Sequence, residues 1–337
     1  MDILTQGLLG ATLAQSQSRQ KETVIATIIG FAAGLLADAD VLIQSSSDPL
    51  LTIEFHRHFT HSIFFIPFGA LIASLILWPF MKKRIDFKRL YVFSLLGYSL
   101  SGFLDACTSY GTHLLWPLMP ERVTFNIISI VDPVFTLGLL AGVIYSLKRK
   151  TSTPARLGLI FAAIYMAIGW TQHQRAEAVM AEVAKERGHA IERGVVKPTL
   201  GNLVAWRSVY QSGDRLYVDG VRVGLAPKFY EGQAVDLFRP EVDFMYMPKE
   251  LALYQDILRF IKFSDGYVAI NPETPHILGD LRYSNKPLGI KPVWGIEMDL
   301  RNPQYHAKYK FYRDLSKENR QQFFDILFGR DLNTLPQ

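Results

Sequence analysis

Cysteine is nearly absent from this chain of 337 residues, and the N-terminus lacks the pattern of a secretory signal. The single cysteine, Cys107, excludes an intramolecular disulfide, so cysteine usage carries no information about the compartment. Asp2 stands where a signal peptide has a basic region, and no small-residue cleavage site follows. We therefore expect the first apolar segment to stay in the mature protein.

Apolar residues make up 49% of the chain, and they are unevenly distributed. Residues 1–172 hold nearly all the long apolar runs, whereas residues 173–337 have the pattern of an ordinary globular sequence. This contrast predicts a membrane α-helical bundle at 1–172 followed by a soluble α+β domain at 173–337. The net charge of +5 does not indicate nucleic acid here, because the basic residues of the first half separate apolar runs and report membrane topology.

Six apolar segments are long enough to suggest membrane spans, since a helix needs about 20 residues to cross a bilayer. The first is short, so five spans are the alternative. The six segments cover roughly residues 3–17, 23–43, 62–81, 90–107, 127–147 and 156–172.

Basic residues between these segments predict an orientation. The loops after the first, third and fifth segments carry two, five and four Lys or Arg residues, whereas the opposite loops carry only Arg57 and Arg122. Basic loops face the cytoplasm. We therefore expect a multi-pass protein of the bacterial cytoplasmic (inner) membrane with an extracytoplasmic 173–337 domain.

Carboxylates and histidines of the first half gather at the predicted outer ends of the spans. Ionisable groups are costly in membranes and usually mark function or a partner. The stretch "HRHFTHS" at 56–62 is the densest cluster, and aspartates end or border three other segments. The residues are Asp38, Asp40, His56, His58, His61, Asp105 and Asp132.

Imidazoles and carboxylates together suit a divalent metal ion, with zinc preferred and manganese or iron as alternatives. His58 and His61 share a helical face at i, i+3, whereas His56 and His61 suit a loop that enters a helix. Asp38 and Asp40 would diverge on a regular helix, so a helix end or turn must present them. A catalytic zinc site also keeps one position open for water.

Five motifs occur in order: "MD-x-x-TQ-x-x-x-G", "DxD", "HR-x-x-THS", "LD-x-x-TSYGT-x-LLWP" and "DP". Over roughly residues 1–145 the chain resembles the YdjM-like family of inner-membrane proteins, which are described as membrane-bound, metal-dependent hydrolases. The resemblance implies metal ligands at Asp38, Asp40, His56, His61 and Asp105. His58 occupies a variable position.

Two residues depart from the family pattern. Many relatives have histidine where this chain has Gln6, and many have histidine where it has Ser101, four residues before Asp105. Either His58 or His113 compensates, or the site binds fewer metal ions.

Each of these candidate site residues also has a simpler structural interpretation. Interfacial histidines can face lipid headgroups, aspartates at helix ends can simply be solvated, and Asp132 before Pro133 can start a helix. Arg57 could orient a phosphate or anchor headgroups. Thr60 and Ser62 are expected to cap the third apolar segment rather than act as nucleophiles.

The leading hypothesis is a membrane-embedded metal-dependent hydrolase that acts at the outer membrane surface on a lipid or phosphoester. Asp40 or Asp132 would serve as general base. The alternative is a non-enzymatic transporter or envelope-assembly factor with a regulatory metal or proton site. Residues 173–337 show hairpin signals such as "SGD" and "DG", further strands and two amphipathic helices, but no catalytic motif.

Overall fold

The computed structural model describes residues 1–314 and 316–332, which divide into two compact units. Unit 1 comprises Met1–Ile43, Phe55–Thr171 and Leu200–Asn202. Unit 2 comprises Gln44–Glu54, Gln172–Thr199 and the described chain from Leu203 onward. The short segment 44–54 thus leaves unit 1 and returns to it.

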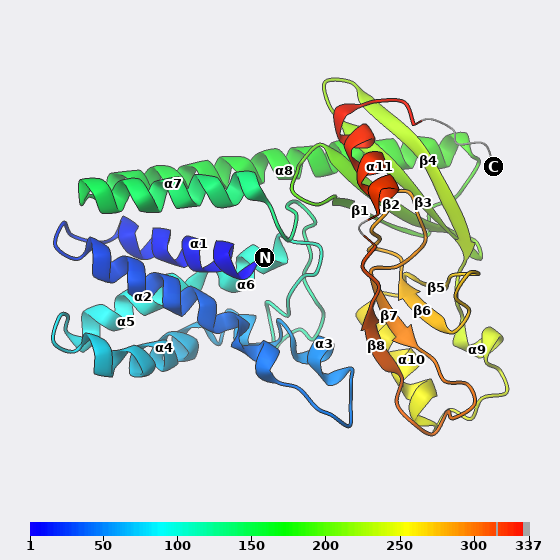
Figure 1. The fold of residues 1–337 in the computed structure, drawn as a ribbon, viewed down its shortest axis with the longest axis horizontal. Coiled ribbons are helices and arrows are strands. Elements are labelled where there is room, and N and C mark those ends of the chain that lie inside the picture. The colour runs from blue at the N-terminus through cyan, green and yellow to red at the C-terminus, as the bar shows by residue number, and fades with distance from the viewer. Residues whose placement is uncertain (315, 333–337) are drawn as a thin grey trace. The chain divides into compact units, whose positions relative to one another are not determined.

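Unit 1 is helical (Figure 1). Its elements are α1 (Ile3–Ser16), α2 (Thr23–Leu36), the 3-10 helices η1 (Ala37–Leu42) and η2 (Phe59–His61), α4 (Ile66–Met81), α5 (Phe87–Ser99), α6 (Ser101–Ala106) and α7 (Pro133–Arg149). The long helix α8 (Thr153–Glu186) begins in unit 1 and ends in unit 2.

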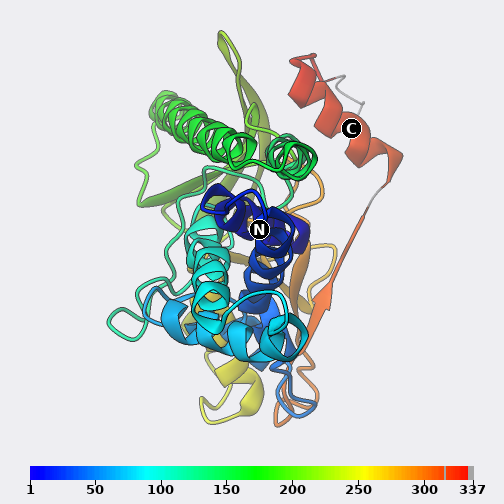
Figure 2. The ribbon, with the colours of Figure 1, turned by 90° about the vertical axis from the view of Figure 1, so that its left-hand side faces the viewer.

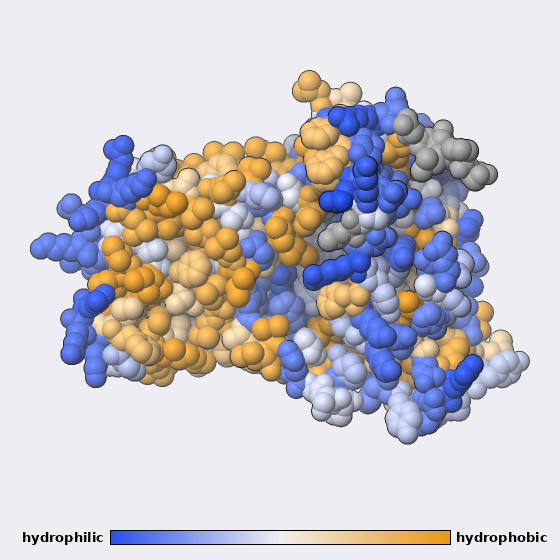
Figure 3. All heavy atoms as spheres, viewed as in Figure 1, coloured by the Kyte–Doolittle hydropathy of each residue, from blue (hydrophilic) through white to orange (hydrophobic). Residues whose placement is uncertain are grey.

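The turns after α1, α4 and α7 lie at one end of unit 1, which Figure 2 faces. These turns carry basic residues, including Lys21, Lys83 and Lys150, and Figure 3 shows a hydrophilic tip at this end of unit 1. Apolar side chains cover much of the outside of the helices behind that tip; Phe68 and Leu137 are both about 60% exposed. A large exposed apolar surface is typical of contact with lipid.

The predicted bundle of six spans is wrong. Within 1–314 and 316–332, two helical stretches, Thr23–Leu42 and Thr153–Glu186, are long and apolar enough to cross a membrane. A third is possible if Leu51–His61 and Ile66–Met81, which meet at a bend of 93°, act together. The other described helices have 17 residues or fewer, at or below the lower end of what a span requires; α1, with 14 residues, is only about 21 Å long.

The apolar runs are longer than the helices because their ends build other structure. The run at 90–107 breaks at Leu100, between α5 and α6. The run at 127–147 becomes helical only at Pro133, because Asp132 caps α7 by accepting hydrogen bonds from Val134 N and Phe135 N, both at 3.1 Å. Non-helical backbone at membrane depth is tolerated where it is buried in protein.

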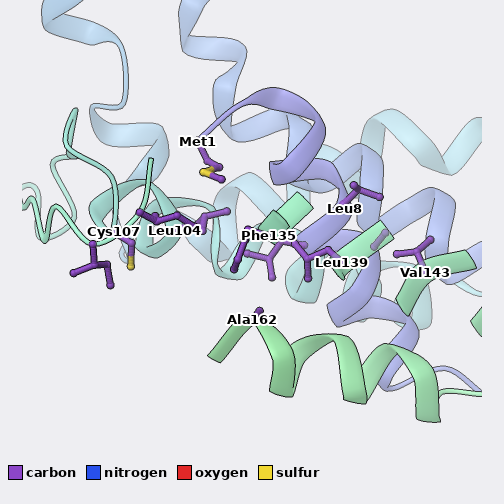
Figure 4. Packing of buried hydrophobic residues seen from close by; sticks show 12 residues of the cluster. Met1, Leu8, Leu104, Cys107, Phe135, Leu139, Val143 and Ala162 are labelled. Carbon is purple, nitrogen blue, oxygen red and sulfur yellow. The ribbon is translucent and has the colours of Figure 1, made fainter. Parts of the chain in front are cut away.

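Close backbone contacts hold α1, α2 and α5 together. A Cβ on Gly10 would lie 2.4 Å from Gly30 O and 2.7 Å from Gly97 O, so no larger residue fits. Small residues therefore let these three helices approach closely. A separate apolar core, which includes Leu104, Phe135 and Leu139, fills the space between α1, α6, α7 and α8 (Figure 4).

Unit 2 contains two four-stranded antiparallel sheets, each in simple sequential order. The first consists of β1 (Arg193–Pro198), β2 (Ala205–Ser212), β3 (Arg215–Val223) and β4 (Pro227–Asp236). The second consists of β5 (Val268–Ile270), β6 (Ile277–Asp280), β7 (Trp294–Glu297) and β8 (Lys308–Phe311). The helices are α3 (Leu51–Phe55), α9 (Pro240–Asp243), α10 (Ala252–Phe263) and α11 (Lys317–Phe328).

The turn and helix patterns in the sequence of this unit agree with the structure at some positions and not at others. The "SGD" turn joins β2 to β3, with Gly213 at φ +59°, a conformation that favours glycine. The "DG" pair instead lies inside β3, where the register shifts between Val218 and Gly220. The second amphipathic helix is α11, which begins at Lys317, and the preceding residues 308–311 form β8.

Candidate metal centre

One aspartate, one histidine and a second aspartate meet inside unit 1. Asp38 comes from η1, His61 from η2 and Asp105 from α6, and one ligand atom of each lies within 4.8 Å of the others. His61 Nε2 is 2.9 Å from Asp105 Oδ2 and 3.3 Å from Asp38 Oδ1. We call these residues the Asp38–His61–Asp105 group.

The facing atoms of this group lack hydrogen-bond partners. Among the described residues, nothing forms a hydrogen bond of acceptable geometry with Asp38 Oδ1, His61 Nε2 or Asp105 Oδ2, and all three atoms are buried. Leaving a buried polar atom unsatisfied costs about 1–3 kcal/mol. Ligands about 2.0–2.2 Å from a zinc ion lie roughly 3.4 Å apart in a tetrahedral site. The donor set and its spacing therefore fit a divalent ion.

Asp40 stands behind His61 rather than in the group. Its Oδ2 accepts hydrogen bonds from Arg57 N at 2.7 Å and Thr60 Oγ1 at 2.8 Å, and it lies 3.3 Å from His61 Nδ1. Its Oδ1 is 3.0 Å from His56 Nδ1. A carboxylate on the rear nitrogen of a ligand histidine fixes the ring and its tautomer.

Arg57 holds the far side of Asp105. Its guanidinium lies 3.3 Å from Asp105 Oδ1, which also accepts a hydrogen bond from the Met1 nitrogen. The same guanidinium donates to Thr108 Oγ1 at 3.1 Å and to Met1 O at 3.2 Å. Because Arg57 is only 4% exposed, it orients Asp105 within the protein and does not face headgroups.

Local backbone structure explains how these side chains converge. The 3-10 helix η1 ends α2 and presents Asp38 and Asp40, as their spacing required. Tyr98 donates a hydrogen bond to Thr60 O at 2.6 Å and so anchors η2 to α5. A Cβ on Gly102 would lie 2.0 Å from His61 O, so α6 can approach η2 only with glycine there.

The other two histidines of "HRHFTHS" lie outside the group. His56 pairs with Asp40, stacks edge-on against Tyr110 at 5.4 Å, and keeps a 28% exposed side chain. His58 lies among aromatic rings, with His113 at 4.4 Å and Trp116 at 5.5 Å between centroids. Hence the structure brings together three of the six expected ligands and places Asp40 beside them.

Three further expectations meet a different structure. Asp132 caps α7, and its Oδ2 accepts a hydrogen bond from Tyr165 at 2.8 Å, so this carboxylate has a structural role at the start of the helix. Thr60 and Ser62 do not cap α4, which begins at Ile66. Thr60 donates to Asp40, and Ser62 donates to Trp116 O.

The two departures from the family pattern meet in space. Gln6 Nε2 donates to Ser101 O at 3.3 Å, and both residues are buried. No described residue forms a hydrogen bond with Gln6 Oε1. The pair that would have been two histidines is thus an amide beside a small hydroxyl residue.

Sequence reasoning missed the residues that support the site. Thr60 forms a hydrogen bond with Asp40, and Tyr98 forms one with the backbone of η2. Thr108 accepts a hydrogen bond from the Arg57 side chain, and Thr112 donates one to the Arg57 carbonyl. Three of them are threonines inside the "HR-x-x-THS" and "TSYGT" motifs. The repeated occurrence of threonine close to the candidate ligands was the feature of the sequence that could have indicated these supporting residues.

Residues 1–176 match the YdjM inner membrane protein family. The chain is also 27% identical over 255 residues to the uncharacterized protein YfhP of Bacillus subtilis (strain 168), covering 72% of this chain and 71% of that protein. No solved structure matches the chain. Because the family match covers more than half of the sequence, the chain belongs to the YdjM inner membrane protein family.

Proposed function

We propose that this inner-membrane protein is a metal-dependent hydrolase whose metal is held by Asp38, His61 and Asp105. One observation carries the proposal: three buried ligand atoms from separate elements face one another without hydrogen-bond partners among the described residues. One imidazole and two carboxylates suit zinc, with manganese or iron as alternatives. A set of three protein ligands is typical of a catalytic zinc site.

The roles of the surrounding residues follow from their contacts. Asp40 holds the rear nitrogen of His61, and Arg57 holds the outer oxygen of Asp105, so both ligands keep their orientation. A divalent ion bound there would supply Lewis acidity, which polarises an ester or phosphoester and makes water a better nucleophile. Asp38, whose side chain is 12% exposed, is the ligand nearest to solvent among the three.

The substrate class and the side of the membrane are part of the proposal. The basic turns lie together at one end of unit 1, and α8 starts at that end and continues into unit 2. If the basic end is cytoplasmic, as the positive-inside rule expects, α8 carries residues 173–337 to the extracytoplasmic side. A site in a membrane protein suits a lipid or a lipid-linked phosphoester.

A second candidate is a non-enzymatic protein that binds a proton at the same place. The separation of 2.9 Å between His61 Nε2 and Asp105 Oδ2 is also that of a charge-assisted hydrogen bond. A protonated His61 between two carboxylates would suit a transporter or an envelope-assembly factor. Metal content distinguishes the two.

The test is metal analysis of the full chain in detergent, with hydrolysis of a generic phosphodiester measured in parallel. We expect about one bound ion per chain in the wild type. His61→Ala should lose most of the metal and the hydrolysis, because one ligand of three is removed. His58→Ala is the matched control: it changes a histidine of the same motif that lies among aromatic rings, and it should keep both. Wild-type protein that never binds a divalent ion would favour the proton site.

A further inference from the structure

Arg259 on α10 forms an unusually complete set of ion pairs inside unit 2. It donates to Glu54 through Nε and Nη2, both at 2.7 Å, and to Asp48 through Nη1 at 3.0 Å and Nη2 at 2.9 Å. Nη1 also donates to Asp256 at 3.0 Å. Paired hydrogen bonds of this kind fix geometry as well as charge.

The two carboxylates that Arg259 holds in this paired manner belong to one short segment. Asp48 and Glu54 lie in Gln44–Glu54, which follows η1 directly and precedes His56 by one residue. The segment therefore connects Asp38 and Asp40 to His56 and His61 along the chain.

The base of this segment is closed at the candidate metal centre. Asp40 accepts hydrogen bonds from Arg57 N and Thr60 Oγ1 and lies beside His56, so residues before and after the segment are tied to each other. Arg259 holds the segment at Asp48 and at its last residue, Glu54. The hydrogen bonds of Arg259 and those of Asp40 therefore act on one continuous stretch of chain.

A second metal site does not explain this cluster. Asp48, Asp256 and His306 also place ligand atoms within 4.8 Å of one another. Arg259, however, donates to both carboxylates, and Asp256 Oδ2 is additionally 2.9 Å from both His306 Nδ1 and Ala307 N. The arginine already supplies the positive charge that a cation would bring.

We propose that Arg259 is a positioning residue for the candidate metal centre: by holding Asp48 and Glu54 it fixes the segment that joins Asp40 to His56, and it thereby sets the metal affinity. This inference rests on the proposed function, since it assumes that the Asp38–His61–Asp105 group binds a metal ion. It assigns residues of the C-terminal half a part in a site whose ligands all come from the N-terminal half.

The test compares zinc affinity of full-length variants in detergent, measured by competition with a chelator of known affinity. Arg259→Gln should weaken zinc binding about tenfold, as loss of an outer-shell support does. Arg259→Lys should recover part of this loss, because it keeps the charge but not the paired hydrogen bonds. Cleavage of residues 44–54 by a protease should rise in Arg259→Gln whether or not zinc is present.

The matched control is Arg187→Gln. Arg187 also holds a carboxylate through two hydrogen bonds, to Asp219 at 2.7 and 3.1 Å, but it has no contact with segment 44–54 among the described interactions. Its variant should lose stability without losing zinc affinity. If Arg259→Gln does not fold, Glu54→Gln removes one partner from the other side and should weaken zinc binding to a smaller extent.

Equal zinc affinity in wild type and Arg259→Gln, with a lowered melting temperature, would overturn the inference and leave Arg259 a purely structural residue. An equal loss of affinity in Arg187→Gln would overturn it as well, because general destabilisation would then explain both. Failure of the proposed function looks different: wild-type protein would bind no zinc, while the protease sensitivity of segment 44–54 would still respond to Arg259.

Discussion

Two groups of two aspartates and one histidine occur among the residues that the structure describes, one in each unit. They satisfy the same distance criterion of 4.8 Å between ligand atoms, so spacing does not separate them. The two groups differ in whether each polar atom has a hydrogen-bond partner. The groups are Asp38–His61–Asp105 and Asp48–Asp256–His306.

In unit 2, Arg259 and the main chain occupy the carboxylate oxygens that face inward, and the histidine side chain is 42% exposed. In unit 1, the facing atoms are buried, and no described residue outside the group donates a hydrogen bond to them or accepts one from them. Identical composition therefore accompanies an ion-pair cluster in one case and, in the other, the buried facing atoms on which the proposed metal site rests. The deciding observation is which buried polar atoms form hydrogen bonds and which do not.

The comparison is most sharply tested by the same change in both groups. Asp105→Asn should lower zinc affinity by at least about 100-fold, because a ligand and its charge are lost. Asp256→Asn should leave zinc affinity close to the wild-type value. It should instead reduce the free energy of unfolding by about 1.5–3 kcal/mol, since it removes charge-assisted hydrogen bonds from a buried carboxylate to the partly exposed Arg259.

Chelator competition and chemical denaturation of both variants supply the measurements. Similar zinc losses in the two variants would mean that the groups do not differ in the way proposed.

A smaller effect concerns acid sensitivity. Burial disfavours the charged form of Asp48, but its hydrogen bonds from Arg259 outweigh burial and hold the pKa of Asp48 below its usual value. A lowered carboxylate pKa stabilises the fold above the unfolded value of about 3.9, and this stability is lost as the pH falls through the folded value. Arg259→Gln should therefore lose less stability than wild type when the pH drops below about 4.

Melting temperatures at pH 7, 5, 4 and 3 test this, with Arg187→Gln as the control. Parallel curves for wild type and Arg259→Gln would contradict it.

The smallest effect is expected at Gln6. Its side chain makes one long hydrogen bond to Ser101 O, at 3.3 Å, and its Oε1 has no partner among the described residues. Gln6→Met keeps the volume and should change the free energy of unfolding by no more than about 1 kcal/mol. Zinc content should stay unchanged. A loss of zinc in this variant would show that Gln6 takes part in the site despite replacing a histidine.

Motifs in the sequence were a good guide to which residues gather, and a poor guide to their roles. Asp38, His61 and Asp105 were named from their motifs and meet in the structure. Spacing did not reveal that His56 turns toward Asp40, because side-chain direction at the irregular stretch before η2 depends on the positive φ of Arg57, +60°.

The count of spans failed for a related reason. Hydropathy measures the length of an apolar run, but it does not register where a helix ends inside the run. Asp132 with Pro133 and the break at Leu100 both shorten helices within apolar sequence. The role of Arg259 was equally inaccessible, since no local pattern links it to residues about 200 positions away.

The burial of the Asp38–His61–Asp105 group has a kinetic consequence. The side chains of His61 and Asp105 are completely inaccessible to solvent, whereas that of Asp38 remains 12% exposed. An ion that enters from the solvent should therefore meet Asp38 first. Such burial should make exchange of a bound ion slow, and a larger side chain at Asp38 should slow it further.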